Sequence, residues 1–398
     1  MKKVVKRKKK NNRKWFVLVG LDIILVLIIV GILLFTKNPT EFHNPDTLIA
    51  LSQLEVNIPK TEHKELSLVM VGDALIHGSV YQDAYQNGTY DFRPMLSLVK
   101  PIIEPFDLAY YNQETILGGT ELGLSSYPRF NSPYEVGDAF LDAGFDMTSL
   151  ATNHTLDKGE QGVLNSLAYW HDKDMITAGQ YSSLEDRNQK RIYEKNGIKF
   201  AFFSYTTVTN GLLPPSGKEY LTNIYSYEKA KRDIEQVKDE VDFIIVAAHW
   251  GTEYTLKETA SQRQMAQELA DLGVNLIIGT HPHVIEPVEY LNNGKTFVIY
   301  SLGNFISDQV GQDRLTGLMM AVTLSSTTYP DGTKENVVTN PKAELLYTKS
   351  TKGEKRNFKV YPYRNLNDTV LENYQETLQK YKSVVETYVK NIVWQVSQ

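Results

Sequence analysis

Residues Leu276–His283 read LIIGTHPH, a short apolar run followed at once by two histidines. The apolar half, Leu276–Gly279, predicts a buried β-strand. In open α/β sheets ligands bind beyond the carboxyl ends of the strands, so the histidines are expected at a rim where other strands also end. Because alternate residues of an extended segment face the same way, His281 and His283 are expected to share a pair of metal ions.

Four more segments place polar side chains directly after a predicted strand. They are Gly72-Asp73 with His77 after Leu66–Val71, Asn112-Gln113-Glu114 after Leu108–Tyr111, Asn153-His154 after Met147–Ala151, and His249-Trp250-Gly251 after Phe243–Ala248. Taken alone, each has an ordinary explanation, because a histidine or asparagine at a strand end usually just satisfies nearby backbone groups. Five such segments in one chain are harder to explain by packing. Imidazole, carboxylate and carboxamide donors suit Zn²⁺, Mn²⁺ or Fe²⁺, so we predict a site for one or two divalent ions.

Strand and helix patterns alternate along the chain, which predicts a layered α/β fold. Two further strands are expected at Phe200–Tyr205 and Phe297–Leu302, and a β-rich stretch runs from Leu315 to about Tyr363. Helical spacing occurs at Gly137–Ala143, Gly159–Lys173, Ser226–Lys238 and Thr259–Leu272, and in a final helix from about Asp368 with an apolar stripe that includes Leu371, Tyr374, Leu378, Tyr381, Val385 and Tyr388.

The N-terminal region has the pattern of a membrane anchor. Residues 1–14 carry nine Lys or Arg and no acid, and the 21 residues of 15–35 are interrupted by a single charge, Asp22. This length spans a bilayer, and the basic flank predicts a cytoplasmic N-terminus with the remainder outside the cell. A cleaved signal peptide would have a shorter apolar run and a small-residue cleavage site, which is not evident. Residues 36–64, with three prolines, predict an extracellular stalk.

Charge and cysteine content limit the partners. Removing the nine basic residues of the tail from the total of 42 leaves 33 against 47 acids, so the remainder is strongly acidic. That balance argues against nucleic acid, and a polyanion would be repelled unless bound cations intervene. The chain has no cysteine, which excludes disulfides and thiolate metal sites and suits a Gram-positive envelope.

The ordered motifs GD, NQE, NH, HWG, GTHPH and SLGNF resemble the capsule biosynthesis protein CapA family, whose members assist poly-γ-glutamate synthesis or export. That family is in turn similar to calcineurin-like metallophosphoesterases. The resemblance covers Leu66–Ser307, and its most specific parts are Ser149–Gly162 and the GTHPH segment. It implies an α/β/β/α sandwich over residues 65–310, preceded by one transmembrane helix, with residues 311–398 packing on the same domain.

The resemblance also implies roles for individual residues. Asp73 and His283 would bind one metal ion, Glu114 would bridge, and Asn153, His249 and His281 would bind a second ion. His154 would act beside the metals as a general acid or as an electrostatic aid, with a pKa tuned by Asp157. The expected wall of the substrate pocket comprises His77, Asn112, Trp250, Glu253 and Asn304.

Two departures from the metallophosphoesterase pattern leave the number of ions and the catalytic activity open. Position 75 is Leu where that pattern has a histidine, and Glu114 stands where it has an aspartate. Three hypotheses follow. The chain is an accessory protein that binds an anionic envelope polymer and works with membrane subunits of a synthase or exporter, a metal-dependent hydrolase of a phosphoester or amide in the envelope, or a non-catalytic scaffold.

Overall fold

A computed structural model describes residues 60–397 of the chain. Within this range no helix is both long and apolar enough to cross a bilayer. The predicted basic tail, the spanning helix at 15–35 and residues 36–59 of the predicted stalk lie outside the described residues. The last three stalk positions, 62–64, belong to the first strand, so the predicted boundary at residue 64 is wrong by three residues.

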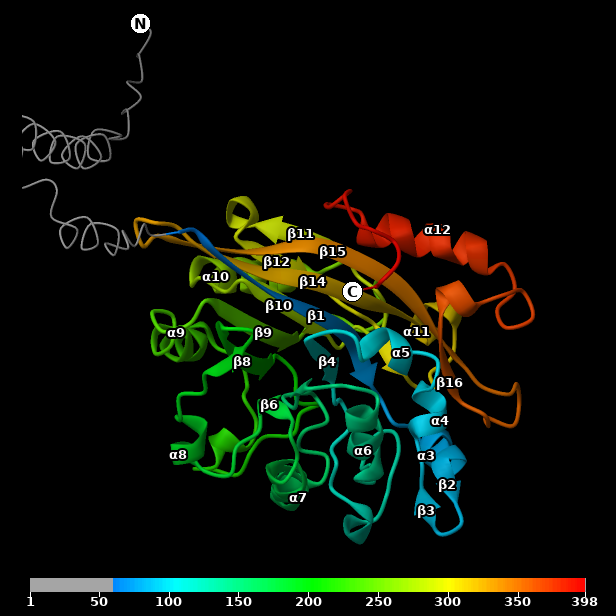
Figure 1. The fold of residues 1–398 in the computed structure, drawn as a ribbon. Coiled ribbons are helices and arrows are strands. Elements are labelled where there is room, and N and C mark those ends of the chain that lie inside the picture. Colours follow the sequence, from blue (N-terminus) through cyan, green and yellow to red (C-terminus); the bar gives the residue numbers. More distant parts are fainter. Residues whose placement is uncertain (1–59, 398) are drawn as a thin grey trace, which may run out of the picture. The chain divides into compact units, whose positions relative to one another are not determined.

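Strand β1 (Glu62–Ala74) organises the larger of two sheets. It pairs antiparallel with β14 and parallel with β4, and near its carboxyl end it also pairs with β13. Figure 1 shows β1 beside the long strands β14 and β15. The sheet has the order β16 (Lys359–Pro362), β15 (Lys334–Lys349), β14 (Thr316–Thr328), β1, β4 (Leu108–Asn112), β5 (Met147–Ser149) and β6 (Ile176–Ala178), with β13 (Asn304–Ile306) on β1.

A second sheet is built around the parallel strands β8, β9, β10 and β12. Its order is β11 (Val288–Leu291), β12 (Thr296–Ile299), β10 (Leu276–Thr280), β9 (Phe243–His249), β8 (Ile198–Thr206) and β7 (Tyr193–Lys195). A short hairpin of β2 (Tyr85–Gln86) and β3 (Thr89–Tyr90) stands apart from both sheets.

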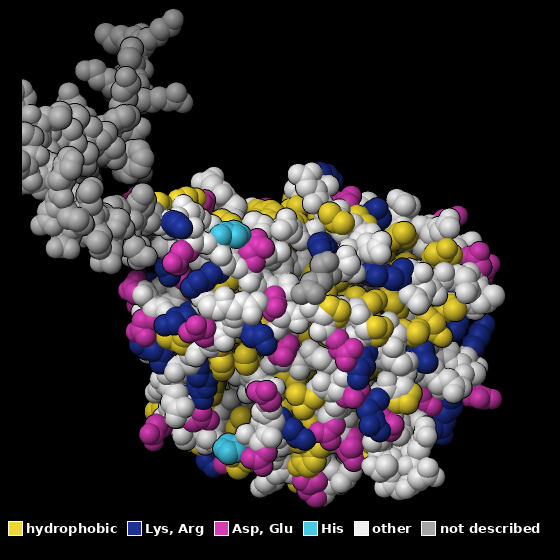
Figure 2. Space-filling view, in the orientation of Figure 1, with side chains coloured by type: hydrophobic (Ala, Val, Ile, Leu, Met, Phe, Trp, Pro, Cys, Tyr) yellow, Lys and Arg dark blue, Asp and Glu magenta, His cyan; other side chains and the backbone are white. Residues whose placement is uncertain are grey.

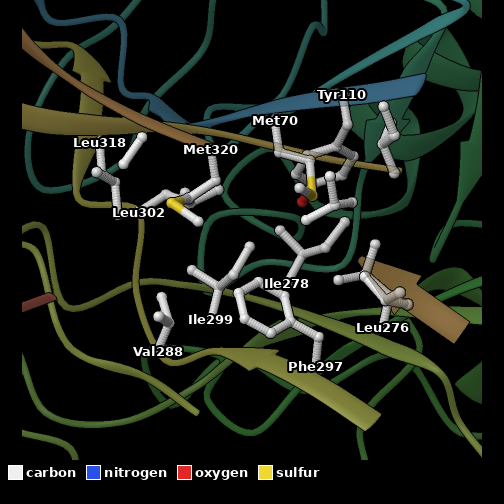
Figure 3. Close-up of a cluster of buried hydrophobic side chains, with 14 of the residues drawn as sticks. Met70, Tyr110, Leu276, Ile278, Val288, Phe297, Ile299, Leu302, Leu318 and Met320 are labelled. Carbon is white, nitrogen blue, oxygen red and sulfur yellow. The ribbon is translucent and has the colours of Figure 1, made fainter. Parts of the chain in front are cut away.

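The two sheets pack face to face through one apolar core. Figure 3 shows Met70, Tyr110 and Met320 of the larger sheet pointing toward Ile278 and Phe297 of the smaller one. All five side chains are fully buried. Since side chains alternate along a strand, the opposite face of each sheet must be covered by other elements.

Helices provide that cover. Buried side chains of α3 (Gly78–Ala84), α4 (Arg93–Leu96), α5 (Lys100–Ile103) and α6 (Glu135–Asp142) pack on the outer face of the larger sheet. Those of α9 (Tyr227–Glu235) and α10 (Ala260–Asp271) pack on the smaller sheet. The described part of the chain therefore forms the predicted mixed α/β fold with two sheets between helical layers. The remaining helices are α7 (Gly159–His171), α8 (Leu184–Arg187), α11 (Gln312–Leu315) and α12 (Tyr374–Val385).

Local sequence explains several boundaries. Thr259 caps α10 by a reciprocal pair of hydrogen bonds with Gln262, as expected for a capping box. The last helix begins at Tyr374 and not near Asp368, because Asn373 adopts a left-handed backbone (φ 55°) that a helix cannot continue through. Tyr381 and Val385 are buried against the inter-sheet core, as the apolar stripe predicts, whereas Tyr388 lies beyond the helix and is 40% exposed.

The surface on the face shown in Figure 2 mixes acidic and basic side chains, with apolar atoms between them. His63 and His171, which the sequence analysis left outside the site, are both on the surface, with side chains 53% and 85% exposed.

Candidate metal centre

The carboxyl ends of parallel strands from both sheets supply the polar side chains of one buried cluster. Asp73 lies near the end of β1 and is in register with Asn112, the last residue of β4. His249 ends β9 and is in register with Thr280 of β10, directly before His281. The parallel arrangement therefore brings residues more than 200 positions apart in sequence to one rim.

Six of these side chains offer ligand atoms in three overlapping groups, and the atoms within each group lie within 4.8 Å of one another. We call the six the His–carboxylate cluster. The groups are Glu114 with His249 and His281, Asp73 with Glu114 and His283, and Glu253 with His281 and His283. His281 and His283 also belong to two groups each, but Glu114 alone joins the group of His249 with the group of Asp73, as a carboxylate between two ions would.

Glu114 is the strongest sign that the cluster holds a cation. Its side chain is fully buried, and neither carboxylate oxygen has a hydrogen-bond partner within residues 60–397. Burial raises the pKa of Glu114 well above its usual range, although the nearby His283 ring opposes the shift. A buried carboxylate without partners is costly, and a bound metal ion would satisfy both oxygens.

The two histidines of the GTHPH segment lie in the cluster, but their backbone conformation differs from the one that the sequence predicted. His281 (φ 96°) and His283 (φ 59°) both adopt left-handed backbone conformations, so the expectation of an extended His-x-His segment is wrong. Their ring centroids nevertheless lie 5.9 Å apart. Non-glycine residues are uncommon in this conformation, and such strain concentrates at functional sites.

The electrostatic surroundings of these two rings differ. Burial lowers the pKa of His281 to about 3, and its Nδ1 has no hydrogen-bond partner in the described part of the chain, so this ring is neutral and can bind a cation. Burial would also lower the pKa of His283, but Glu114 and Asp73 outweigh it and raise the value to about 9. His283 Nε2 lies 3.5 Å from Glu114 Oε1, and its Nδ1 lies 3.3 Å from Asp73 Oδ2.

His249 is held on both ring nitrogens. Nδ1 lies 3.0 Å from Thr280 Oγ1, and Nε2 lies 3.0 Å from Asn153 Oδ1. Burial together with the neighbouring His281 lowers the pKa of His249 well below its usual range. The structure thus brings Asn153, whose carboxamide was predicted as a ligand, into direct contact with a histidine of the cluster.

His154 and Asp157 form a hydrogen-bonded pair beside the cluster. His154 Nδ1 lies 2.6 Å from Asp157 Oδ2, which also accepts a hydrogen bond from the Phe130 backbone N–H at 2.6 Å. The Phe130 ring contacts the edge of the imidazole at a centroid distance of 4.6 Å. Asp157 therefore fixes the orientation of the His154 ring, as the predicted pairing requires.

A cavity of about 480 Å³ opens beside the cluster. Its lining includes six of the predicted site residues, namely His77, Asn153, His154, Asp157, Glu253 and His283. Burial lowers the pKa of His77 to about 4. His77 Nδ1 lies 3.0 Å from the Leu75 carbonyl oxygen, to which it can donate, and 3.2 Å from the Asp308 backbone nitrogen.

Three residues expected on the pocket wall lie behind it instead. Asn112 Nδ2 donates to Asp73 Oδ1 at 2.8 Å, and Asn304 Oδ1 lies 3.0 Å from His283 Nδ1, so both orient cluster residues. Trp250 is part of the core against α10, and its indole N–H donates to the Tyr300 carbonyl. For these three the wall assignment is wrong. Trp250 follows His249 directly, and neighbouring side chains point opposite ways. Asn112 and Asn304 lie on strands that pair with β1, and their side chains turn to cluster residues.

Other cavity residues were not predicted. They lie on four loops and include Tyr127, Arg129, Phe130, Asn210, Tyr254 and Gln309. Loop residues of this kind carry no period or strand-end signal, so only the tertiary structure reveals them.

The chain belongs to the family of the bacterial capsule synthesis protein PGA_cap, whose family model matches residues 67–309, more than half of the chain. The class expected from the motif order is therefore confirmed.

Among curated proteins, the chain is 34% identical over 179 residues to the PGA biosynthesis protein CapA of Bacillus subtilis (strain 168), covering 42% of this chain and 44% of that protein. It is 25% identical over 315 residues to the capsule biosynthesis protein CapA of Bacillus anthracis, covering 77% of this chain and 71% of that protein. The match thus spans less than half of the first relative.

A solved structure of a candidate 5′-nucleotidase from Staphylococcus aureus aligns with 79% of this chain and 57% of its own, with 15% identity and a TM-score of 0.46. Similarity at this level says nothing about substrate or activity.

Proposed function

We propose that this chain is an accessory protein of capsular polymer formation, acting through a divalent metal site on an anionic polymer such as poly-γ-glutamate during its synthesis, export or anchoring. The observation that carries the proposal is the fully buried carboxylate of Glu114, which lies among His249, His281 and His283 and finds no hydrogen-bond partner in residues 60–397. Its contact with His283 is a charge contact at 3.5 Å. The relatives' described role in capsule biosynthesis supports the choice of polymer.

The residues present fit a metal ion. Glu114, His249 and His281 would hold one ion, with Asn153 next to His249 as a further oxygen donor. Asp73, Glu114 and His283 would hold a second. Nitrogen and oxygen donors of this mixture favour Mn²⁺, Zn²⁺ or Fe²⁺. When bound, such an ion supplies positive charge that attracts anionic oxygens of a ligand.

A bound cation in the cluster would also reduce the repulsion between the acidic chain and an anionic polymer. The chain beyond its basic tail is acidic, and an anionic polymer would be repelled from it. Cations held by Asp73 and Glu114 neutralise two of those acids at the place where the cavity opens, so a polymer carboxylate can approach. In this proposal the main domain lies outside the cell, held at the membrane by residues 15–35, where it can contact membrane subunits of a synthase or exporter.

A metal-dependent hydrolase acting on a phosphoester or amide is the second candidate, and the His154–Asp157 pair favours it. His154 lines the cavity, and its Nδ1 is bound to Asp157, which leaves Nε2 as the nitrogen that can exchange a proton with a ligand. A histidine positioned in this way is suited to general acid catalysis. Turnover of a generic phosphodiester that is lost in His154→Ala would establish this candidate.

The test of the main proposal is a chromosomal replacement by the double variant His281→Ala/His283→Ala. We expect loss of cell-bound anionic polymer at unchanged protein level, since both rings are needed for the cluster. Replacement of the exposed His171 by Ala serves as the matched control and should leave the polymer unchanged. Normal polymer in the double variant would overturn the proposal.

A further inference from the structure

A second hollow lies between α7 and β6, the last strand of the larger sheet (Figure 1). Its volume is about 410 Å³, within the range of ligand pockets, and it shares no lining residue with the cavity beside the cluster. Leu164, Leu167 and Ala168 of α7 give it an apolar wall, and Thr177 of β6 also lines it. We call this space the α7 hollow.

Trp170 lines the α7 hollow and has an indole N–H without an acceptor. The residue is 3% exposed, yet no hydrogen bond of its Nε1 is found among the described residues. The other two tryptophans of that range both donate, Trp250 to the Tyr300 carbonyl and Trp394 to a Glu386 carboxylate oxygen. Because a buried tryptophan usually has an acceptor for its N–H, the indole of Trp170 is suited to an acceptor supplied by a ligand.

Gln180 supplies the complementary group at the same hollow. It is 5% exposed, and its Nε2 donates to the Leu150 carbonyl at 3.0 Å, whereas its Oε1 has no donor within the described part of the chain. In the other two buried glutamines, Gln113 and Gln262, both ends of the side chain are hydrogen-bonded. One unmet donor and one unmet acceptor therefore line a single hollow, and an amide group carries the matching pair.

The backbone of β6 offers a further donor and acceptor. The Ile176 N–H donates to the Asp146 carbonyl and the Ala178 carbonyl accepts from the Leu150 N–H, so both residues bond toward β5. In a parallel pair the residue between them directs its N–H and carbonyl to the opposite side. That residue is Thr177, and for its backbone groups no partner is found among the residues that the structure describes. An edge of this kind can pair with another extended chain.

The charged side chains around the hollow are paired with one another. Arg191 and Asp186, which both line it, form an ion pair. His171, also on its wall, has Nδ1 2.9 Å from Asp172 Oδ1. Since these charges compensate each other, the hollow favours an uncharged ligand over an ionic one.

We propose that the α7 hollow binds a short, uncharged segment of a partner protein in extended conformation. Its backbone pairs with Thr177, its amide groups bind the Trp170 N–H and Gln180 Oε1, and its aliphatic side chains contact the apolar wall of α7. Main-chain hydrogen bonds give affinity in this mode of recognition, and the pockets for alternate side chains give specificity. The inference goes beyond the proposed function, because it concerns a protein partner and needs neither the metal site nor the polymer.

The test is fluorescence anisotropy of a labelled peptide, Ser-Val-Ser-Leu-Ser-Val-Ser with both ends capped, titrated with the purified full-length protein. Alternate side chains of an extended peptide face the same way, so its aliphatic residues can all face the hollow. Trp170→Phe should weaken binding about fivefold, because one hydrogen bond is lost. Trp394→Phe is the matched control, since its indole donates elsewhere, and it should bind like the wild type.

A second pair of variants tests the place of binding without touching a buried residue. Ala168→Arg puts a long side chain at an exposed position on the wall of the hollow and should block the peptide. Gln161→Arg puts the same side chain at an exposed position of α7 that does not line the hollow, and it should leave binding unchanged.

A peptide that is methylated on the backbone nitrogen of its leucine cannot donate that hydrogen bond and should bind the wild type more weakly. The inference is overturned if the wild type does not bind the unmethylated peptide, if the methylated peptide binds equally well, or if Ala168→Arg binds as tightly as Gln161→Arg. Crystals soaked with the peptide that show only ordered water on Trp170 Nε1 and Gln180 Oε1 would also overturn it. None of these outcomes changes the metal site, so the proposed function is tested separately.

Discussion

The effect of Glu114→Gln on the stability of the fold should depend on metal. Without metal the variant should be more stable than the wild type, and with metal it should be less stable. The wild-type carboxylate is fully buried, has no hydrogen-bond partner among the described residues, and burial raises its pKa well above the usual range. When a carboxyl group has a higher pKa in the folded than in the unfolded protein, the free energy of unfolding is greatest below the unfolded-state pKa. It falls as the pH rises from the unfolded-state pKa toward the folded-state pKa. At pH 7 in chelator, Glu114→Gln should therefore stabilise the protein by about 1–3 kcal/mol, the cost of an unsatisfied buried polar group.

With metal bound, the wild type should be more stable than the Glu114→Gln variant. An ion present at about a hundred times its dissociation constant stabilises the folded wild type by about 2.7 kcal/mol. For a domain of this size that corresponds to a rise in melting temperature of about 5 °C. The glutamine variant lacks the shared ligand of two groups in the cluster, so its melting temperature should hardly respond to metal.

The assay is thermal unfolding of full-length wild type and variant at pH 7, each in chelator and in Mn²⁺ or Zn²⁺. Glu286→Gln is the matched control, because Glu286 is also buried and burial raises its pKa to about 8, but it belongs to none of the three ligand groups. The reasoning is refuted if Glu114→Gln keeps the full response to metal, or if Glu286→Gln loses it as well.

Three further predictions follow from the same contacts. The apparent metal affinity should rise about tenfold per pH unit between pH 7 and pH 9, because His283, with a pKa of about 9, must lose its proton to bind the ion; a pH-independent affinity by calorimetry would contradict this. Gly72→Ala should destabilise the fold by about 3 kcal/mol or more, since its Cβ would lie 1.8 Å from the Gly303 carbonyl oxygen, whereas Gly78→Ala, with no neighbour nearer than 3.4 Å, should be tolerated; equal chemical denaturation midpoints would show the close approach to be unimportant. Asp157→Asn should cost about 1–3 kcal/mol, because its Oδ2 accepts from both His154 and the Phe130 N–H, and an unchanged unfolding free energy would count against that buried arrangement.

The strand ends were the part of the site that the sequence could predict. Asp73, Asn112 and His249 each lie at or near the end of a strand that was expected from an apolar run, and parallel pairing brings such ends together. Burial of both faces of a strand leaves a readable signal, because nearly every residue is apolar. The helix predicted from spacing at Thr259–Leu272 agrees with α10 (Ala260–Asp271) to within one residue at each end, and Thr259 is its N-cap.

Features that depend on contacts between distant segments were not predicted. The bent backbone at His281 and His283 is not visible in a His-Pro-His sequence, and the backbone decides which way both rings point. Asn304 was taken as a wall residue, but it lies on the short strand β13, whose pairing with β1 turns its side chain toward His283. Trp250 follows a cluster histidine in sequence and yet packs in the core.

The central claim is that the His–carboxylate cluster holds a divalent cation, and the most direct measurement is an anomalous-scattering map from crystals of the protein grown with Mn²⁺. We predict a strong peak between Glu114 and the rings of His249 and His281, with any second peak between Asp73 and His283. A map without a peak at Glu114, from protein that is otherwise folded as described, would contradict the claim.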